Sequence, residues 1–267
     1  MAVDMTALAK DLEAETASLR EVLWAASASD WDAPTQAAGW SVRDQVAHLA
    51  YFDDVTVLAM TDPEEFRRLS QEHVEGGMDF PDRLVASQRS IPLEELKVWF
   101  GSSRSKLVSV AAGMDPKVRV PWYGPAMSAS SCVTARLMET WAHGVDVADT
   151  LGAAIVASSR LRHVAHIGVG AFAYSFAVRA LPVPAEPVRI ELQAPDGGVW
   201  TWGQEGGADL VKGTALDFCL VVTQRRHRLD TGLTVSGATA SAWIGVAQAF
   251  AGSPGVGRPP GSLVAIR

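Results

Sequence analysis

The chain has 267 residues, of which 48% are hydrophobic and 20% charged, and this balance excludes a disordered or collagen-like protein. Its net charge of −7 repels phosphate backbones, and the chain has no Lys/Arg-rich run with interleaved aromatics, so a nucleic-acid partner is excluded. Cys132 and Cys219 lie far apart in apolar sequence, which predicts reduced core thiols in a cytoplasmic protein. The longest apolar stretch, 164–181, contains His166, Ser175 and Arg179, so we expect a buried helix there and no membrane contact.

The first part of the chain shows helical periodicity. Apolar residues recur at helical spacing over 8–23, which predicts a first helix. Ser41 and Asp44 form an S-x-x-D capping box that predicts the start of a second helix, which runs to about Met60. The polar, acidic segment 61–80 is interpreted as a loop.

Two further helical patterns follow. One covers 82–112 with a break near Pro92, and Gly113 is its natural stop. After a Pro-Trp-Tyr-Gly-Pro loop, Ser128 can cap a helix that ends at Gly152. Four helices with intervening loops predict a helical bundle.

The pattern changes beyond about residue 158. We expect a helix to about residue 181, a hairpin of strands 188–193 and 199–202, a helix at 214–223, a strand at 233–235 and a helix at 238–250. The predicted fold class is therefore α + (α+β), with a four-helix bundle over residues 1–155 and a smaller α+β domain over residues 156–267. The active site is expected in the cleft between the two.

Three residues could bind one metal ion. Glu139 and His143 are four residues apart on the last bundle helix, so both side chains leave the same helix face. This pair is common by chance, and its other interpretation is an ordinary surface or core pair. His48, in the middle of the second helix, is the candidate third ligand because a bundle can turn its face toward the last helix.

The run G-W-S-V-R-D-Q-V-A-H-L around His48, together with R-L-M-E-T-W-A-H-G-V-D around Glu139 and His143, resembles the DinB/YfiT-like metal-binding bundles. More narrowly, the sequence resembles the branch of mycothiol-dependent maleylpyruvate isomerase, closely over residues 1–155 and more loosely beyond. The resemblance implies a divalent ion bound by His48, Glu139 and His143. Zinc is the favoured ion, with nickel and iron as alternatives. Three His/His/carboxylate ligands leave an open position, as in catalytic zinc sites.

Other candidate site residues surround this set. Asp44 could orient the second ring nitrogen of His48, although it also completes the capping box, and Asp146 could support the ring of His143 or be solvated. Trp122 and Tyr123 precede the ligand helix and are candidate substrate-binding residues, with hydrophobic cover as the alternative. Cys132 is interpreted as a core residue and not as a ligand.

The second domain offers one candidate catalytic residue. The resemblance places a substrate-contacting arginine at Arg225, after a short apolar run. Its guanidinium suits bidentate carboxylate binding, and a solvated pair with Arg226 is the alternative.

The resemblance further implies mycothiol as a thiol cosubstrate. Attack of its thiolate on an activated C=C bond, rotation and expulsion of the thiol would give isomerisation, and retention of the adduct would give S-transfer. A hydrolase, or a non-catalytic protein that binds a metal or a small molecule, is the alternative. The expected partners are thus a small electrophile and a low-molecular-weight thiol, and the sequence does not define the oligomeric state.

Overall fold

A computed structural model describes residues 3–262 except 76 and 78. The chain divides into two compact units, Met1–Ala154 and Ile155–Arg267. The predicted fold class is confirmed, since the first unit is helical and the second combines helices with a small sheet. In the part of the chain that the structure describes, no helix has the length and apolar character to span a membrane.

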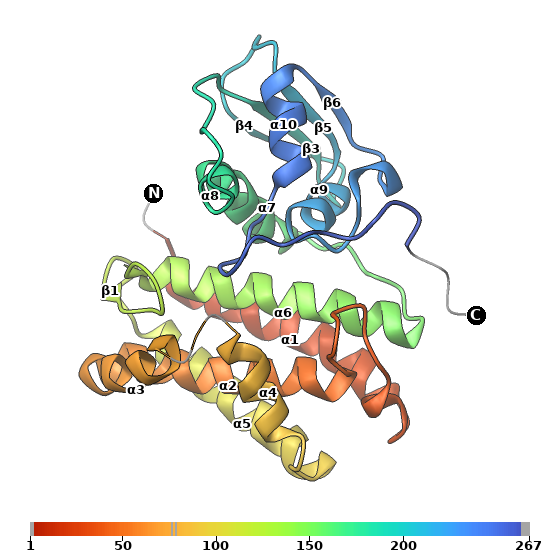
Figure 1. The fold of residues 1–267 in the computed structure, drawn as a ribbon. Helices are drawn as coiled ribbons and strands as arrows, with labels where there is room; N and C mark the ends of the chain where they lie inside the picture. The colour runs from red at the N-terminus through yellow and green to blue at the C-terminus, as the bar shows by residue number, and fades with distance from the viewer. Residues whose placement is uncertain (1–2, 76, 78, 263–267) are drawn as a thin grey trace. The chain divides into compact units, whose positions relative to one another are not determined.

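The first unit is built mainly of helices (Figure 1). Its elements are α1 (Met5–Ala25), η1 (Asp30–Asp32), α2 (Val42–Thr61), α3 (Pro63–Glu75), α4 (Phe80–Gln88), α5 (Leu93–Ala112), β1 (Arg119–Val120), β2 (Met127–Ser128) and α6 (Ala129–Leu151). Helices α1, α2, α5 and α6 pack against one another as the predicted bundle.

Local sequence signals set the ends of the bundle helices. The predicted capping box of Ser41 and Asp44 is present at the start of α2. Ser128 caps α6, where its side chain accepts a hydrogen bond from the Ser131 backbone N–H. Gly152 ends α6 in the left-handed conformation with φ of 66°, which a residue without Cβ adopts without strain.

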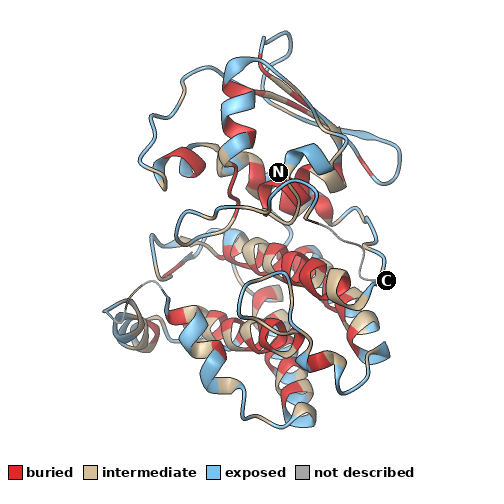
Figure 2. Ribbon diagram, turned by 45° about the vertical axis from the view of Figure 1, so that its right-hand side comes forward, coloured by how far each residue is buried: buried red, intermediate tan, exposed pale blue. Residues whose placement is uncertain are grey.

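The bundle core lies where the apolar faces of these helices meet (Figure 2). Leu23 of α1, Val46 and Leu49 of α2 and Phe100 of α5 are fully buried in one cluster. Val147 of α6 joins the same cluster, so all four helices contribute to it. Burial of this apolar surface is the main stabilising term for the unit.

One sequence prediction in the first unit was wrong. The segment 61–80 is not simply a loop, because α3 covers Pro63–Glu75. This helix is mostly charged and polar, and its ion pairs at i,i+3 and i,i+4 spacing join Arg68 to Glu65 and Glu72. Phe66 is buried, but charged and polar residues make up most of the segment, and this composition resembles that of a loop.

The second unit combines helices with a four-stranded sheet. Its elements are α7 (Leu161–Gly170), α8 (Phe172–Ala177), β3 (Arg189–Gln193), β4 (Val199–Trp202), β5 (Leu210–Thr214), α9 (Ala215–Val222), η2 (Arg228–Asp230), β6 (Thr234–Ser236) and α10 (Ala238–Val246). The strand order is β4-β3-β5-β6, in which β3 and β5 are parallel and the other pairs antiparallel. Gly168 of α7 lies so close to α9 that an added Cβ would be 2.6 Å from Val222 Cγ2.

The second unit differs from prediction at three places. The helix expected to reach residue 181 is broken into α7 and α8 at Ala171. Strand β5 was not predicted, and the helix expected over 238–250 ends at Val246. Strand β5 contains Lys212 and Gly213 and pairs with a strand on each side, so its strand form depends on partners that no local pattern reveals.

Candidate metal centre

His48 of α2 and Glu139 and His143 of α6 lie together within the first unit. One potential ligand atom from each residue lies within 4.8 Å of the other two. His143 Nε2 is 3.1 Å and His48 Nε2 is 3.6 Å from Glu139 Oε2. The histidine side chains are about one-tenth exposed and the Glu139 side chain 24%, so the group is largely shielded but open to a ligand.

The surroundings of His48 and Glu139 shift the pKa values of both side chains. Burial, together with the neighbouring His143, lowers the pKa of His48 to about 4, so His48 is neutral near neutral pH. Burial by itself would raise the pKa of Glu139, but hydrogen bonds and charge interactions with His143 and His48 hold it well below its usual range. Two imidazoles and one carboxylate form a donor set that fits a divalent ion with an open position.

Aromatic rings surround the two histidines. Trp40 stacks on His143, with ring centroids 5.8 Å apart and an angle of 6° between the planes. Phe52 packs against His48 at 4.6 Å. Trp122 and Tyr123 contact Phe52 at 6.2 and 5.9 Å, which places both predicted substrate-binding residues one ring away from His48.

Asp44 and Asp146, the two carboxylates predicted to support the ligand histidines, lie at different distances from them. Asp44 accepts hydrogen bonds from the Ser41 backbone N–H and from Arg89, and the described residues provide no hydrogen-bond partner for His48 Nδ1. The expected contact of Asp44 with His48 is therefore not formed, because the capping box holds this carboxylate at the helix end. Asp146 lies closer to a candidate ligand than Asp44 does. Its Oδ2 is 3.9 Å from His143 Nδ1, a distance longer than a hydrogen bond.

The hydrogen-bond partner of His143 Nδ1 is Gln45, which was not among the predicted site residues. Its side chain is fully buried, and its Oε1 accepts a hydrogen bond from His143 Nδ1. The sequence did contain a signal for this role. Gln45, three positions before His48, is a polar residue on the apolar face of the second helix, which it shares with Val46 and Leu49.

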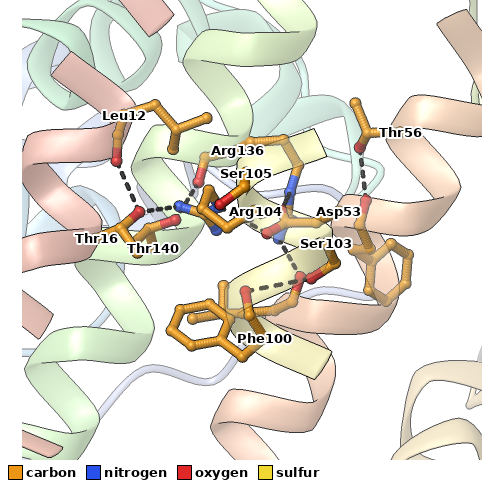
Figure 3. Close-up of polar contacts among 12 residues, drawn as sticks. Leu12, Thr16, Asp53, Thr56, Phe100, Ser103, Arg104, Ser105, Arg136 and Thr140 are labelled. Carbon is orange, nitrogen blue, oxygen red and sulfur yellow. Dashed lines mark hydrogen bonds and ion pairs between the residues drawn. The ribbon is translucent and has the colours of Figure 1, made fainter. Parts of the chain in front are cut away.

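A buried ionic network joins the bundle helices beside this group (Figure 3). Asp53 of α2 is fully buried and accepts from Arg104 Nε of α5 at 2.6 Å and from Arg136 Nε of α6 at 3.2 Å. Arg104 also donates to Thr16 Oγ1 of α1, so all four bundle helices take part. Arg136 Nη2 donates to the Leu49 carbonyl at 3.2 Å, which ties the ligand helix α6 to the residue after His48.

Arg225 lies in the second unit, three residues beyond the end of α9. Its Nη1 donates a hydrogen bond to the Thr223 carbonyl at 2.8 Å, and its backbone N–H bonds to the Leu220 carbonyl. Gln224, before it, has a positive φ of 61° and donates from its side chain to the Ala247 carbonyl. Hydrogen bonds to nearby backbone carbonyls thus hold Arg225 in an ordered turn.

A DinB-like helical bundle followed by a small α+β unit is the class of protein that this fold defines. A family model described as the mycothiol maleylpyruvate isomerase N-terminal domain matches residues 12–148, and the chain belongs to this family. A second model, described as wyosine base formation, matches residues 184–231 of the second unit, less than half of the chain.

The chain is also similar to a mycobacterial protein over nearly its whole length and to solved structures of the same fold. An uncharacterized protein of Mycobacterium tuberculosis, present in strains CDC 1551 and H37Rv, is 40% identical over 93% of this chain and 96% of its own length. The crystal structures of the mycothiol-dependent maleylpyruvate isomerase and of a mutant of it match with a TM-score of 0.58 at 16% identity. Each match covers 88% of this chain and 93% of the other, and it shows a common fold.

Proposed function

We propose that the chain is an enzyme that binds one divalent metal ion through His48, Glu139 and His143, with zinc as the favoured ion. We further propose that it uses a low-molecular-weight thiol to isomerise a small unsaturated acid. The observation that carries the proposal is the convergence of these three ligand atoms within 4.8 Å in a chain of this family. Mycothiol is the proposed thiol and maleylpyruvate the first candidate substrate, because the structural neighbour is a mycothiol-dependent maleylpyruvate isomerase.

The residues present fit a bound ion. Nε2 of His143 and Oε2 of Glu139 lie 3.1 Å apart, a separation at which both atoms could bind one cation. A bound divalent ion would supply Lewis acidity that keeps a thiol as thiolate near neutral pH. Trp40 and Phe52 cover the histidine rings and exclude water from their faces.

The proposed reaction balances without an added oxidant or reductant. The thiolate sulfur adds to one carbon of a cis double bond, and the electron pair moves into the conjugated acid or carbonyl group. Rotation about the new single bond and expulsion of the thiolate then restore the double bond in the trans form. Trp122 and Tyr123 are proposed to contact the substrate, since they pack on Phe52 next to His48.

The direct test mixes zinc-loaded protein, mycothiol and maleylpyruvate and follows the substrate and product by NMR. We expect formation of the trans isomer that stops when either the thiol or, after chelation, the metal is omitted. A product that keeps the thiol would assign the S-transferase form of the proposal. Turnover without any thiol would indicate a hydrolase, and inactivity on a panel of unsaturated acids would favour a non-catalytic binding protein.

Arg225 is proposed to bind a carboxylate of the substrate or thiol. Arg225→Lys keeps the positive charge but loses the planar pair of N–H groups, so we expect kcat/KM to fall about ten- to a hundredfold. A charge-assisted hydrogen bond of about 1.5–3 kcal/mol accounts for this range. Metal content and the unfolding midpoint should stay unchanged.

The matched control is Arg226→Lys, which alters the neighbouring arginine in the same turn and should leave kcat/KM close to wild type. Equal turnover by the wild type and Arg225→Lys would remove Arg225 from the active site.

A further inference from the structure

A chain of three hydrogen bonds runs from a backbone carbonyl to the candidate ligand His143. The Thr35 hydroxyl donates to the Trp40 carbonyl at 2.8 Å, Gln45 Nε2 donates to Thr35 Oγ1 at 2.8 Å, and Gln45 Oε1 bonds to His143 Nδ1. Thr35 and Trp40 belong to the loop before α2, while His143 belongs to α6.

The direction of each bond in this chain is fixed by the one before it. A backbone carbonyl only accepts, so the Thr35 hydroxyl proton must point to Trp40. The Thr35 oxygen then accepts from its neighbours, which include the Ala37 backbone N–H at 3.2 Å, and the Gln45 group that faces it must be the NH₂. The Gln45 oxygen therefore faces His143, and Nδ1 of His143 must carry the proton.

Because Nδ1–H is held by Gln45, Nε2 is the ring nitrogen of His143 that is available to bind an ion. The same atom lies 3.1 Å from Glu139 Oε2, and the ring centroids of His143 and His48 are 4.6 Å apart. Trp40 adds a second restraint, since its ring lies parallel to the His143 ring. The other ligand differs, because His48 Nδ1 is buried and has no hydrogen-bond partner among the described residues.

We propose that Gln45, oriented by Thr35, is a positioning residue that fixes the Nδ1–H tautomer and the ring plane of His143 and so prepares its Nε2 to bind the metal ion. The proposal rests on the metal site proposed above. Metal-ligating histidines usually donate their second N–H to a carboxylate or carbonyl group, and loss of that partner costs about ten- to a hundredfold in metal affinity. Gln45 supplies a neutral acceptor, so it orients the ring without adding charge.

The test measures zinc affinity of the full-length chain by competition with a chromophoric chelator. Gln45→Leu removes the acceptor at similar volume and should weaken zinc binding about ten- to a hundredfold. Gln45→Glu keeps an acceptor for Nδ1–H and should bind zinc at least as tightly as wild type. Thr35→Val removes the group that orients the amide and should give a smaller loss than Gln45→Leu.

A second readout separates positioning from a general loss of structure. In zinc-loaded protein with ¹⁵N-labelled histidine, a hydrogen-bonded Nδ1–H of His143 gives a downfield, slowly exchanging signal, which should persist in Gln45→Glu and vanish in Gln45→Leu. The matched control is Gln88→Leu in α4, where the amide bonds to the neighbouring Ser87 and zinc affinity should not change.

The outcomes are distinct. A wild type that binds no zinc would refute the proposed metal site itself. A wild type that binds zinc together with a folded Gln45→Leu of equal affinity would overturn only the role of Gln45. If Gln45→Leu does not fold, weak zinc binding by a folded Gln45→Glu would overturn it as well.

Discussion

Replacing His143 with alanine should reduce bound zinc from about one equivalent to nearly none when a competing chelator is present. Structural zinc sites with four ligands bind with apparent free energies of about 10–16 kcal/mol, or roughly 2.5–4 kcal/mol per ligand. With three protein ligands, loss of one should therefore weaken binding by roughly a hundred- to a thousandfold. His48→Ala and Glu139→Ala should act alike, as measured by metal analysis after dialysis against the chelator.

Two further variants sharpen this test. Glu139→Gln keeps the shape of the side chain but removes its charge, so a loss of zinc here would assign the effect to the carboxylate. His166→Ala, which alters an exposed histidine of α7, is the control and should retain full metal content. Full occupancy in all three alanine variants would contradict the assignment of the site.

The sequence predicted those parts of the fold that local signals specify. The capping box at Ser41 and the Ser128 and Gly152 caps define helix ends through contacts within a few residues, and the structure confirms all three. Strand β5 could not be found in this way, since its place between β3 and β6 comes from pairing with distant segments.

In the candidate site, too, residues with a local motif could be predicted and residues placed by long-range packing could not. His48, Glu139 and His143 could be named from their motifs, and the structure brings their ligand atoms together. Gln45 could not be assigned, because its bond to His143 joins α2 to α6 and exists only in the packed bundle. The role of Asp53 could not be predicted for the same reason, because its two arginine partners come from α5 and α6.

The second large effect is expected at Asp53. Asp53→Ala should lower the free energy of unfolding by about 3–5 kcal/mol, because it leaves Arg104 and Arg136 buried without their counter-ion. Burial already lowers the pKa of the Arg104 guanidinium, and the charge and hydrogen bonds of Asp53 oppose that shift. Domains are stable by only about 5–15 kcal/mol, so the variant should unfold at much lower urea concentration, as followed by circular dichroism.

The neighbouring residue supplies the control. Asp54 also lies on α2 but is exposed, where it accepts a hydrogen bond from Trp99 Nε1 at 2.7 Å, so Asp54→Ala should leave the urea midpoint near that of wild type. Asp53→Ala should also weaken zinc binding, because the network ties the helix of Glu139 and His143 to the carbonyl after His48. An unchanged urea midpoint in Asp53→Ala would show that the two arginines find other partners, and that the ionic network does not hold the ligand helices together.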